Sequence, residues 1–301
     1  MSTSLLPNRF SELVELSIIN WDWDQLPDSM ENIWDALMTQ IFLGPTVRTA
    51  QATYIKQVLE PLICHSAAPN VNQSGWSNVL LSHLQNVKNS IRNTPNESQK
   101  SAIISLTEQD VSDLKLSRTI YDSLIFFKQN RINVHRIHQL MGDTSETENL
   151  AYSASKNIYN VALTKAVLWL YGCGIAQDLV PPNTHVVGFL NQYSFIDLGW
   201  DPSKWPPDWQ RFSICCKKVN EISITVARDL GKDVSSKQVQ ASIWYLQTCR
   251  GLLSRGNRGK MNPDKLISFL DYQNWSIKDL EEHIVDIELL EDLEASLNSF
   301  M

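Results

Sequence analysis

Two lysines and an asparagine are the residues of this chain best placed to do chemistry. Lys156 and Lys165 lie in the most apolar predicted helix, residues 153–171. Asn183 follows a proline-rich loop and is expected to be the N-cap of the next helix. A lysine amine that is shielded from water can attack an electrophilic carbon and form a Schiff base. Because the sequence has no P-loop, GxGxxG, HExxH or GxSxG motif, this arrangement is the only one that suggests a reaction.

The elements around these residues follow a definite order. A short predicted helix, 133–141, ends at Gly142 and is followed by a polar hairpin, 143–155. The lysine-bearing helix and a loop lead to the motif Pro182-Asn183-Thr184-His185-Val186. This order resembles the helix-hairpin-helix DNA glycosylases, most closely the archaeal 8-oxoguanine DNA glycosylase/lyase branch. Two further segments are similar to that branch, ALMTQIFLGPTVRTAQATYIKQ and VARDLGKDVSSKQVQASIWYL.

The resemblance covers residues 31–260 in patches and implies an all-α fold of two helical lobes with a cleft between them. We expect one lobe from 1–48 and 156–301, with an acidic C-terminal helix at 279–301. The other lobe is expected at 49–155 and ends in the hairpin. The implied activity is excision of a damaged or modified base, which is flipped out of DNA before its N-glycosidic bond is cleaved. An additional lyase step would then cut the strand.

Each lysine is a candidate nucleophile. In the spacing of the archaeal branch, counted back from Gly174, the family's catalytic lysine corresponds to Lys156. This residue is expected at the start of its helix, where the positive end of the helix disfavours an ammonium. In the spacing of the eukaryotic and bacterial 8-oxoguanine enzymes, counted back from Asn183, it corresponds to Lys165, whose apolar neighbours also suit a purely structural lysine. We expect Lys156 to be the nucleophile and keep Lys165 as the alternative.

Asn183 departs from the family pattern, which has Asp at this position. An amide cannot stabilise the positive charge that develops on the sugar. The sequence leaves three possibilities. Asn183 orients water or substrate for a lysine-driven enzyme, another carboxylate such as Asp178 replaces the missing one, or the protein binds without catalysis.

The expected contacts with DNA come from four places. Gly142 in the hairpin and His185 beside Asn183 are candidate phosphate contacts, and so is the glycine-interleaved basic run Arg250, Arg255, Arg258 and Lys260. The tryptophans of a proline-rich segment are candidates to stack on the extruded base: Trp200, Trp205 and Trp209. An ordinary pocket suits 8-oxoguanine. A larger pocket would suit a bulky base such as glucosylated hydroxymethylcytosine of phage DNA, and would indicate an antiviral defence role.

Composition limits the remaining classes. The net charge is −7, but without the eight acidic residues beyond Lys278 the chain has 26 basic and 25 acidic residues, so DNA remains a plausible partner. The five cysteines are scattered without metal-ligand spacing, which favours reduced thiols in the cytoplasm and no metal or cofactor. No long apolar run indicates a membrane, and we expect a monomer. The alternatives are a non-catalytic DNA- or protein-binding module and a nucleoside or nucleotide N-glycosidase on the same fold.

Overall fold

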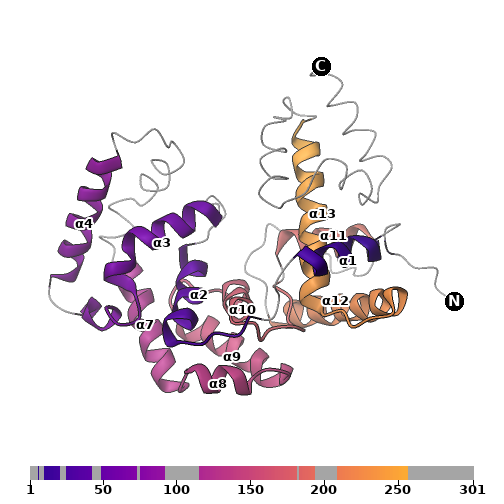
Figure 1. Cartoon of the computed structure of the whole chain (residues 1–301), viewed down its shortest axis with the longest axis horizontal. Coiled ribbons are helices and arrows are strands. Elements are labelled where there is room, and N and C mark those ends of the chain that lie inside the picture. The colour runs from indigo at the N-terminus through magenta and orange to yellow at the C-terminus, as the bar shows by residue number, and fades with distance from the viewer. Residues whose placement is uncertain are drawn as a thin grey trace. The chain divides into compact units, whose positions relative to one another are not determined.

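The structure is a computed structural model that describes Leu6 and residues 10–20, 25–42, 49–72, 75–91, 115–181, 183–193 and 209–256. These residues form helices joined by turns and contain no β-strand (Figure 1). The all-α class predicted from the sequence is therefore confirmed. No helix within these ranges has the length and apolar character needed to span a membrane. The expected acidic helix at 279–301 lies outside them.

The chain divides into two compact units, one of residues 24–176 and one that joins 1–23 to 177–301. The sequence suggested boundaries at 48 and 155, whereas the observed ones follow Trp23 and Ala176. The difference arises because α2 (Met30–Phe42) packs against both α3 (Thr49–Ile63) and α10 (Leu163–Gly172). These contacts keep all three helices in the same unit.

The unit 24–176 continues α2 and α3 with several further elements. They are the 3₁₀ helix η1 (Ala68–Asn72), α4 (Trp76–Ile91), α7 (Lys115–Gln129), α8 (Val134–Gln139), α9 (Thr144–Asn157) and then α10.

Aromatic side chains form the centre of this unit. Trp34 meets the ring of Phe127 edge-on at 5.3 Å, and Phe127 stacks on Trp169 at 5.5 Å. Both buried indole groups donate hydrogen bonds to backbone carbonyls, Trp34 to Ile63 at 2.7 Å and Trp169 to Ile33 at 3.1 Å. Because the indole N–H groups are satisfied, these rings contribute their apolar area without leaving a buried donor unpaired.

The segment 153–171 is not one helix, which corrects the sequence prediction. α9 ends at Asn157, a tight turn follows, and α10 begins at Leu163. The expected polar hairpin at 143–155 is instead almost wholly helix α9, whose N-cap Asp143 accepts a hydrogen bond from the Glu146 amide. Gly142, with φ of +80°, lies in the short turn between α8 and α9.

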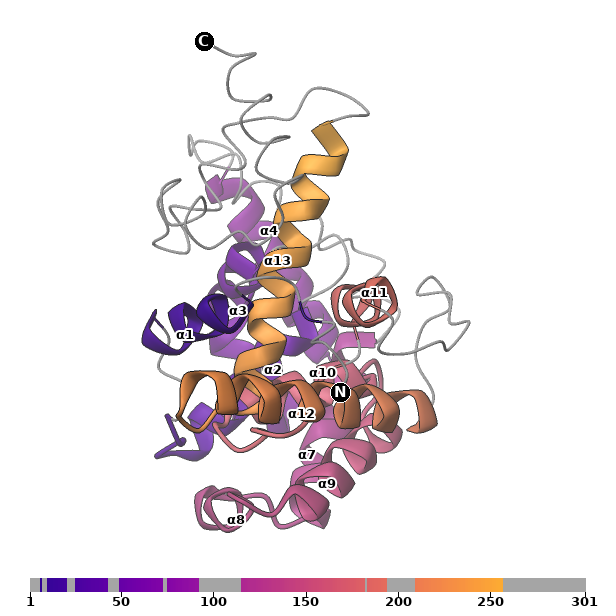
Figure 2. The ribbon, with the colours of Figure 1, turned by 90° about the vertical axis from the view of Figure 1, so that its right-hand side faces the viewer.

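The second unit combines the two ends of the chain. It contains α1 (Phe10–Asn20), α11 (Thr184–Gln192), α12 (Trp209–Leu230) and α13 (Ser236–Gly256). α13 crosses α12, as both views show (Figures 1 and 2). α1 is fixed to the loop region after α12 by a salt bridge of 2.7 Å between Glu15 and Lys232. Ser11 also donates to Asp229 at 3.0 Å, so the start of the chain is held against its C-terminal half.

Candidate active site

The turn between α9 and α10 is short and tightly defined. The Ile158 amide donates to the Ala154 carbonyl at 3.0 Å, and the Val161 amide donates to the Ile158 carbonyl at 3.2 Å. Asn160 has φ of +59°, a left-handed conformation that asparagine adopts more readily than most residues. Ile158 and Val161 are buried and anchor the turn on either side of Asn160. α9, this turn and α10 form one continuous structural element at residues 144–172.

Lys165 lies in the first turn of α10, directly after this element's turn. It is half-buried, and its amine donates a 3.1 Å hydrogen bond to the Ile41 carbonyl in the last turn of α2. Burial lowers the pKa of Lys165 from 10.5 to about 8, because an ammonium loses hydration there. At neutral pH the free amine is therefore more populated than in an ordinary lysine.

Lys156 occupies a different environment from the one expected. It lies in the last turn of α9, not at the start of a helix, and its side chain is exposed. Its ammonium group is 5.2 Å from the centre of the Tyr152 ring, one helical turn earlier. The physical argument that favoured Lys156 was its position at the positive end of a helix, and this argument was wrong. Lys165 does lie at the positive end of a helix, because it is in the first turn of α10.

Two buried polar atoms, on the residues that precede Ile41 and Lys165 in the sequence, were missed by the sequence analysis. Gln40 precedes Ile41 and Thr164 precedes Lys165, and each buries a side-chain oxygen with no hydrogen-bond partner among the described residues. An unsatisfied buried polar atom typically costs about 1–3 kcal/mol.

Asn183 is the N-cap of α11, as the sequence predicted. Its side-chain oxygen accepts hydrogen bonds from the amides of His185 at 3.0 Å and Val186 at 2.9 Å. The His185 ring meets Trp244 of α13 edge-on at 6.1 Å. The structure therefore brings Asn183 and His185 together in one helical turn, within the unit that contains 177–301. Lys156, Lys165 and Gly142 belong to the unit 24–176.

The remaining predicted residues are spread over the second unit. Asp178 is an exposed residue of the loop that follows α10. Trp209 begins α12 and packs its ring against Phe212 at 5.2 Å, which is a structural contact within one helix. Arg250 and Arg255 lie within α13, which extends to Gly256. Four predicted residues lie outside the described part of the chain: Trp200, Trp205, Arg258 and Lys260.

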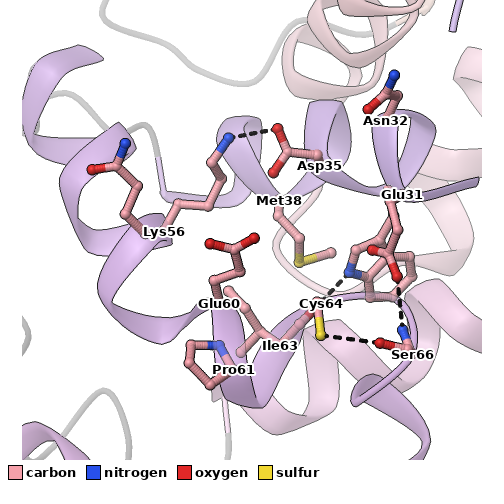
Figure 3. Close-up of a pocket in the computed structure, with 12 residues that line it drawn as sticks. Glu31, Asn32, Asp35, Met38, Lys56, Glu60, Pro61, Ile63, Cys64 and Ser66 are labelled. Atoms are coloured by element: carbon pink, nitrogen blue, oxygen red, sulfur yellow. Dashed lines mark hydrogen bonds and ion pairs between the residues drawn. The ribbon is translucent and has the colours of Figure 1, made fainter. Parts of the chain in front are cut away.

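A surface cleft of about 730 Å³ lies between α2 and α3 (Figure 3). The Lys56 amine spans it to Asp35 at 2.6 Å, while the carboxylate of Glu60 points into the open space. At the other end, the carboxylate of Glu31 accepts the amides of His65 and Ser66 at 3.0 and 3.2 Å. Three charged side chains of the cleft, Glu31, Asp35 and Lys56, thus hold α2 to α3 and to the residues that follow α3. Lys165 does not line it.

No group of three His, Cys, Asp or Glu side chains within the described ranges has the arrangement of a metal site. Comparisons with protein-family models, with curated proteins and with solved structures find no match to the chain.

Proposed function

We propose that this chain is a DNA N-glycosylase of the helix-hairpin-helix type, with the amine of Lys165 as its nucleophile. The observation that carries the proposal is the position of Lys165: the first turn of a helix, directly after a tight turn, half-buried, with a pKa of about 8. On this proposal the family's hairpin corresponds to Ile158–Ala162, and α9 and α10 are its two helices. The two-lobed glycosylase arrangement is part of the same proposal.

The chemistry begins with the neutral amine of Lys165. Its lone pair attacks C1′ of the flipped nucleotide, a C1′–N bond to the lysine forms, and the glycosidic bond breaks. The base leaves with the bonding electrons and takes up a proton, while the new amine–sugar adduct loses one. Ring opening of the sugar gives a Schiff base, from which elimination cuts the strand. Desolvation of the amine favours this route because an ammonium has no lone pair to donate.

A phosphate of the DNA backbone is proposed to lie at the start of α10. The N-cap residue is Ala162, so no side chain caps the first amides of this helix. Those amides and the positive end of the helix suit an anion, and they bind it without regard to sequence. A phosphate there would also bring the strand close to Lys165.

Asn183 is proposed to act as a donor. Since its oxygen caps α11, its NH₂ group is the part that orients a sugar or water. The missing carboxylate makes the enzyme depend on the lysine amine.

The test is incubation with duplexes that carry a panel of modified bases, from 8-oxoguanine to glucosylated hydroxymethylcytosine, followed by alkali to reveal abasic sites. Borohydride reduces a Schiff base to a stable amine, so it should trap a covalent protein–DNA adduct with the active substrate. Lys165→Met should abolish trapping, and the matched control Lys156→Met should retain it. Trapping that is lost only in Lys156→Met would exclude Lys165 as the nucleophile.

A second candidate function is a DNA-binding module without catalysis. The observation that favours it is the amide side chain at the N-cap of α11: position 183 is Asn where the family has Asp, so no acid stands there. Salt-dependent duplex binding with no base release from any member of the panel would support the module and contradict the enzyme.

A further inference from the structure

The α9–α10 turn is held from outside by two residues of α7. The carboxylate of Asp122 accepts a hydrogen bond from the Tyr159 amide, with 3.2 Å between Oδ2 and N. The Nε atom of Arg118 is 3.6 Å from the same carboxylate oxygen. The guanidinium carbon of Arg118 also lies 4.5 Å from the centre of the Tyr159 ring. These three side chains are called the turn clip below.

The turn needs such support because of its backbone. Asn160 adopts a left-handed conformation, which costs free energy for a residue that has a Cβ atom, although less for asparagine than for most, so contacts from outside the turn help to hold it. The Tyr159 amide directly precedes Asn160 and is bonded to Asp122, 37 positions earlier in the sequence. This contact is therefore a tertiary restraint on a strained turn, and not part of the local helix geometry.

Within the clip, Asp122 is the residue that bonds the backbone. Its side chain is 25% exposed, whereas that of Arg118 is 65% exposed, so the hydrogen bond from Tyr159 is the better shielded contact. A hydrogen bond to a charged acceptor is also stronger than one between neutral groups. Arg118 pairs with the carboxylate and covers the tyrosine ring, which keeps both in place.

We propose that Asp122 is a positioning residue for Lys165: it fixes the α9–α10 turn and thereby the first turn of α10, where Lys165 lies. Asp122 acts on the lysine through the turn. The effect of Asp122 on the reaction rests on the function proposed above, whereas the effect of Asp122 on the turn and on Lys165 does not.

The experiment compares Asp122→Ala and Asp122→Asn with the wild type. Asparagine keeps an oxygen that can accept from the Tyr159 amide, so it is the conservative variant. The matched control is Asp143→Ala, which removes a carboxylate that accepts a backbone amide at the opposite end of α9, from Glu146 at 2.9 Å. Three quantities are measured: hydrogen exchange of the Tyr159 amide, the pH dependence of acylation of Lys165 by acetic anhydride, and the rate of borohydride trapping on saturating DNA.

We expect Asp122→Ala to accelerate exchange of the Tyr159 amide about tenfold, the change that corresponds to losing one charge-assisted hydrogen bond. The midpoint of Lys165 acylation should rise from about 8 toward 10.5, since a loosened turn admits water to the amine. Trapping should slow about tenfold. Asp122→Asn should stay within about threefold of the wild type in both rates, and Asp143→Ala should leave the Lys165 midpoint unchanged.

If Asp122→Ala gives the same exchange rate of the Tyr159 amide and the same acylation midpoint of Lys165 as Asp143→Ala, Asp122 is not a positioning residue. If the wild type releases no base and traps no DNA, the proposed enzyme is wrong. The exchange and acylation results still decide whether Asp122 positions Lys165, because both are measured on the free protein.

Discussion

The amine of Lys165 and the carbonyl of Ile41 form a 3.1 Å hydrogen bond that joins the first turn of α10 to the last turn of α2. Two effects oppose each other there. The carbonyl end of α2 carries partial negative charge and favours an ammonium, while burial disfavours it. Burial prevails, since the pKa of Lys165 is lowered to about 8.

The lowered pKa makes stability depend on pH. Between about pH 8 and 10.5 the unfolded chain binds a proton at Lys165 that the folded chain has lost, so the free energy of unfolding rises with pH in this window. The full rise is at most about 3.4 kcal/mol, at 1.36 kcal/mol per pKa unit over 2.5 units. Urea unfolding at several pH values should show it in the wild type and not in Lys165→Met. If the free energy of unfolding changes with pH in the same way for the wild type and Lys165→Met, the amine of Lys165 is not buried.

Replacement of Asn183 separates its capping role from its chemistry. Asn183→Ala removes the acceptor for two amides and should lower the free energy of unfolding by about 0.5–2 kcal/mol. Asn183→Asp retains the cap and adds a carboxylate at the positive end of α11, so stability should be kept and base excision preserved or raised. The measurements are urea unfolding and the yield of abasic sites. Loss of excision in Asn183→Asp would show that the amide itself is required.

Gly174 should not tolerate a side chain. Its φ is +71°, and a Cβ atom there would lie 2.8 Å from the Gln25 carbonyl oxygen. Gly174→Ala combines a left-handed backbone with a clash against main chain, and should destabilise the unit by about 2 kcal/mol or more. The control is Gly142→Ala, where φ is +80° and nothing lies within 4 Å, so that only the backbone term of about 1–2 kcal/mol remains. If Gly174→Ala and Gly142→Ala lose the same amount of stability in thermal unfolding, the clash at Gly174 does not contribute.

The basic run at the end of α13 should contribute to DNA affinity through charge alone. Each replacement of Arg250, Arg255, Arg258 or Lys260 by Ala should weaken binding similarly for unrelated duplex sequences. The slope of log affinity against log salt should fall by about one for each phosphate contact that is lost. Unchanged affinity after all four replacements would show that this segment does not touch DNA.

The start of α11 was predicted from Asn183, because an asparagine that can cap a helix is a strong local signal. The turn between α9 and α10 was missed for a physical reason. The buried residues Ala151, Ala154, Ile158 and Val161 keep helical spacing straight through it, so the apolar period shows no interruption.

A local signal for that turn was nevertheless present. Asn157 and Asn160 are residues that commonly end helices and adopt left-handed conformations. The burial of Lys165 and the contact of Asp122 with the Tyr159 amide had no such signal, because both depend on helices distant in the sequence. The site's chemical environment therefore required the tertiary structure, although its lysines could be chosen beforehand.

The pairing of α1 with the C-terminal half of the chain has a consequence for synthesis on the ribosome. α1 leaves the exit tunnel more than two hundred residues before its partners Asp229 and Lys232 are made. The unit 24–176 has all its own helices by then and can fold as a domain while the chain is still growing. The apolar residues Phe10, Leu13 and Val14, buried in the folded unit, must stay exposed or shielded by other molecules until α12 and α13 have been made.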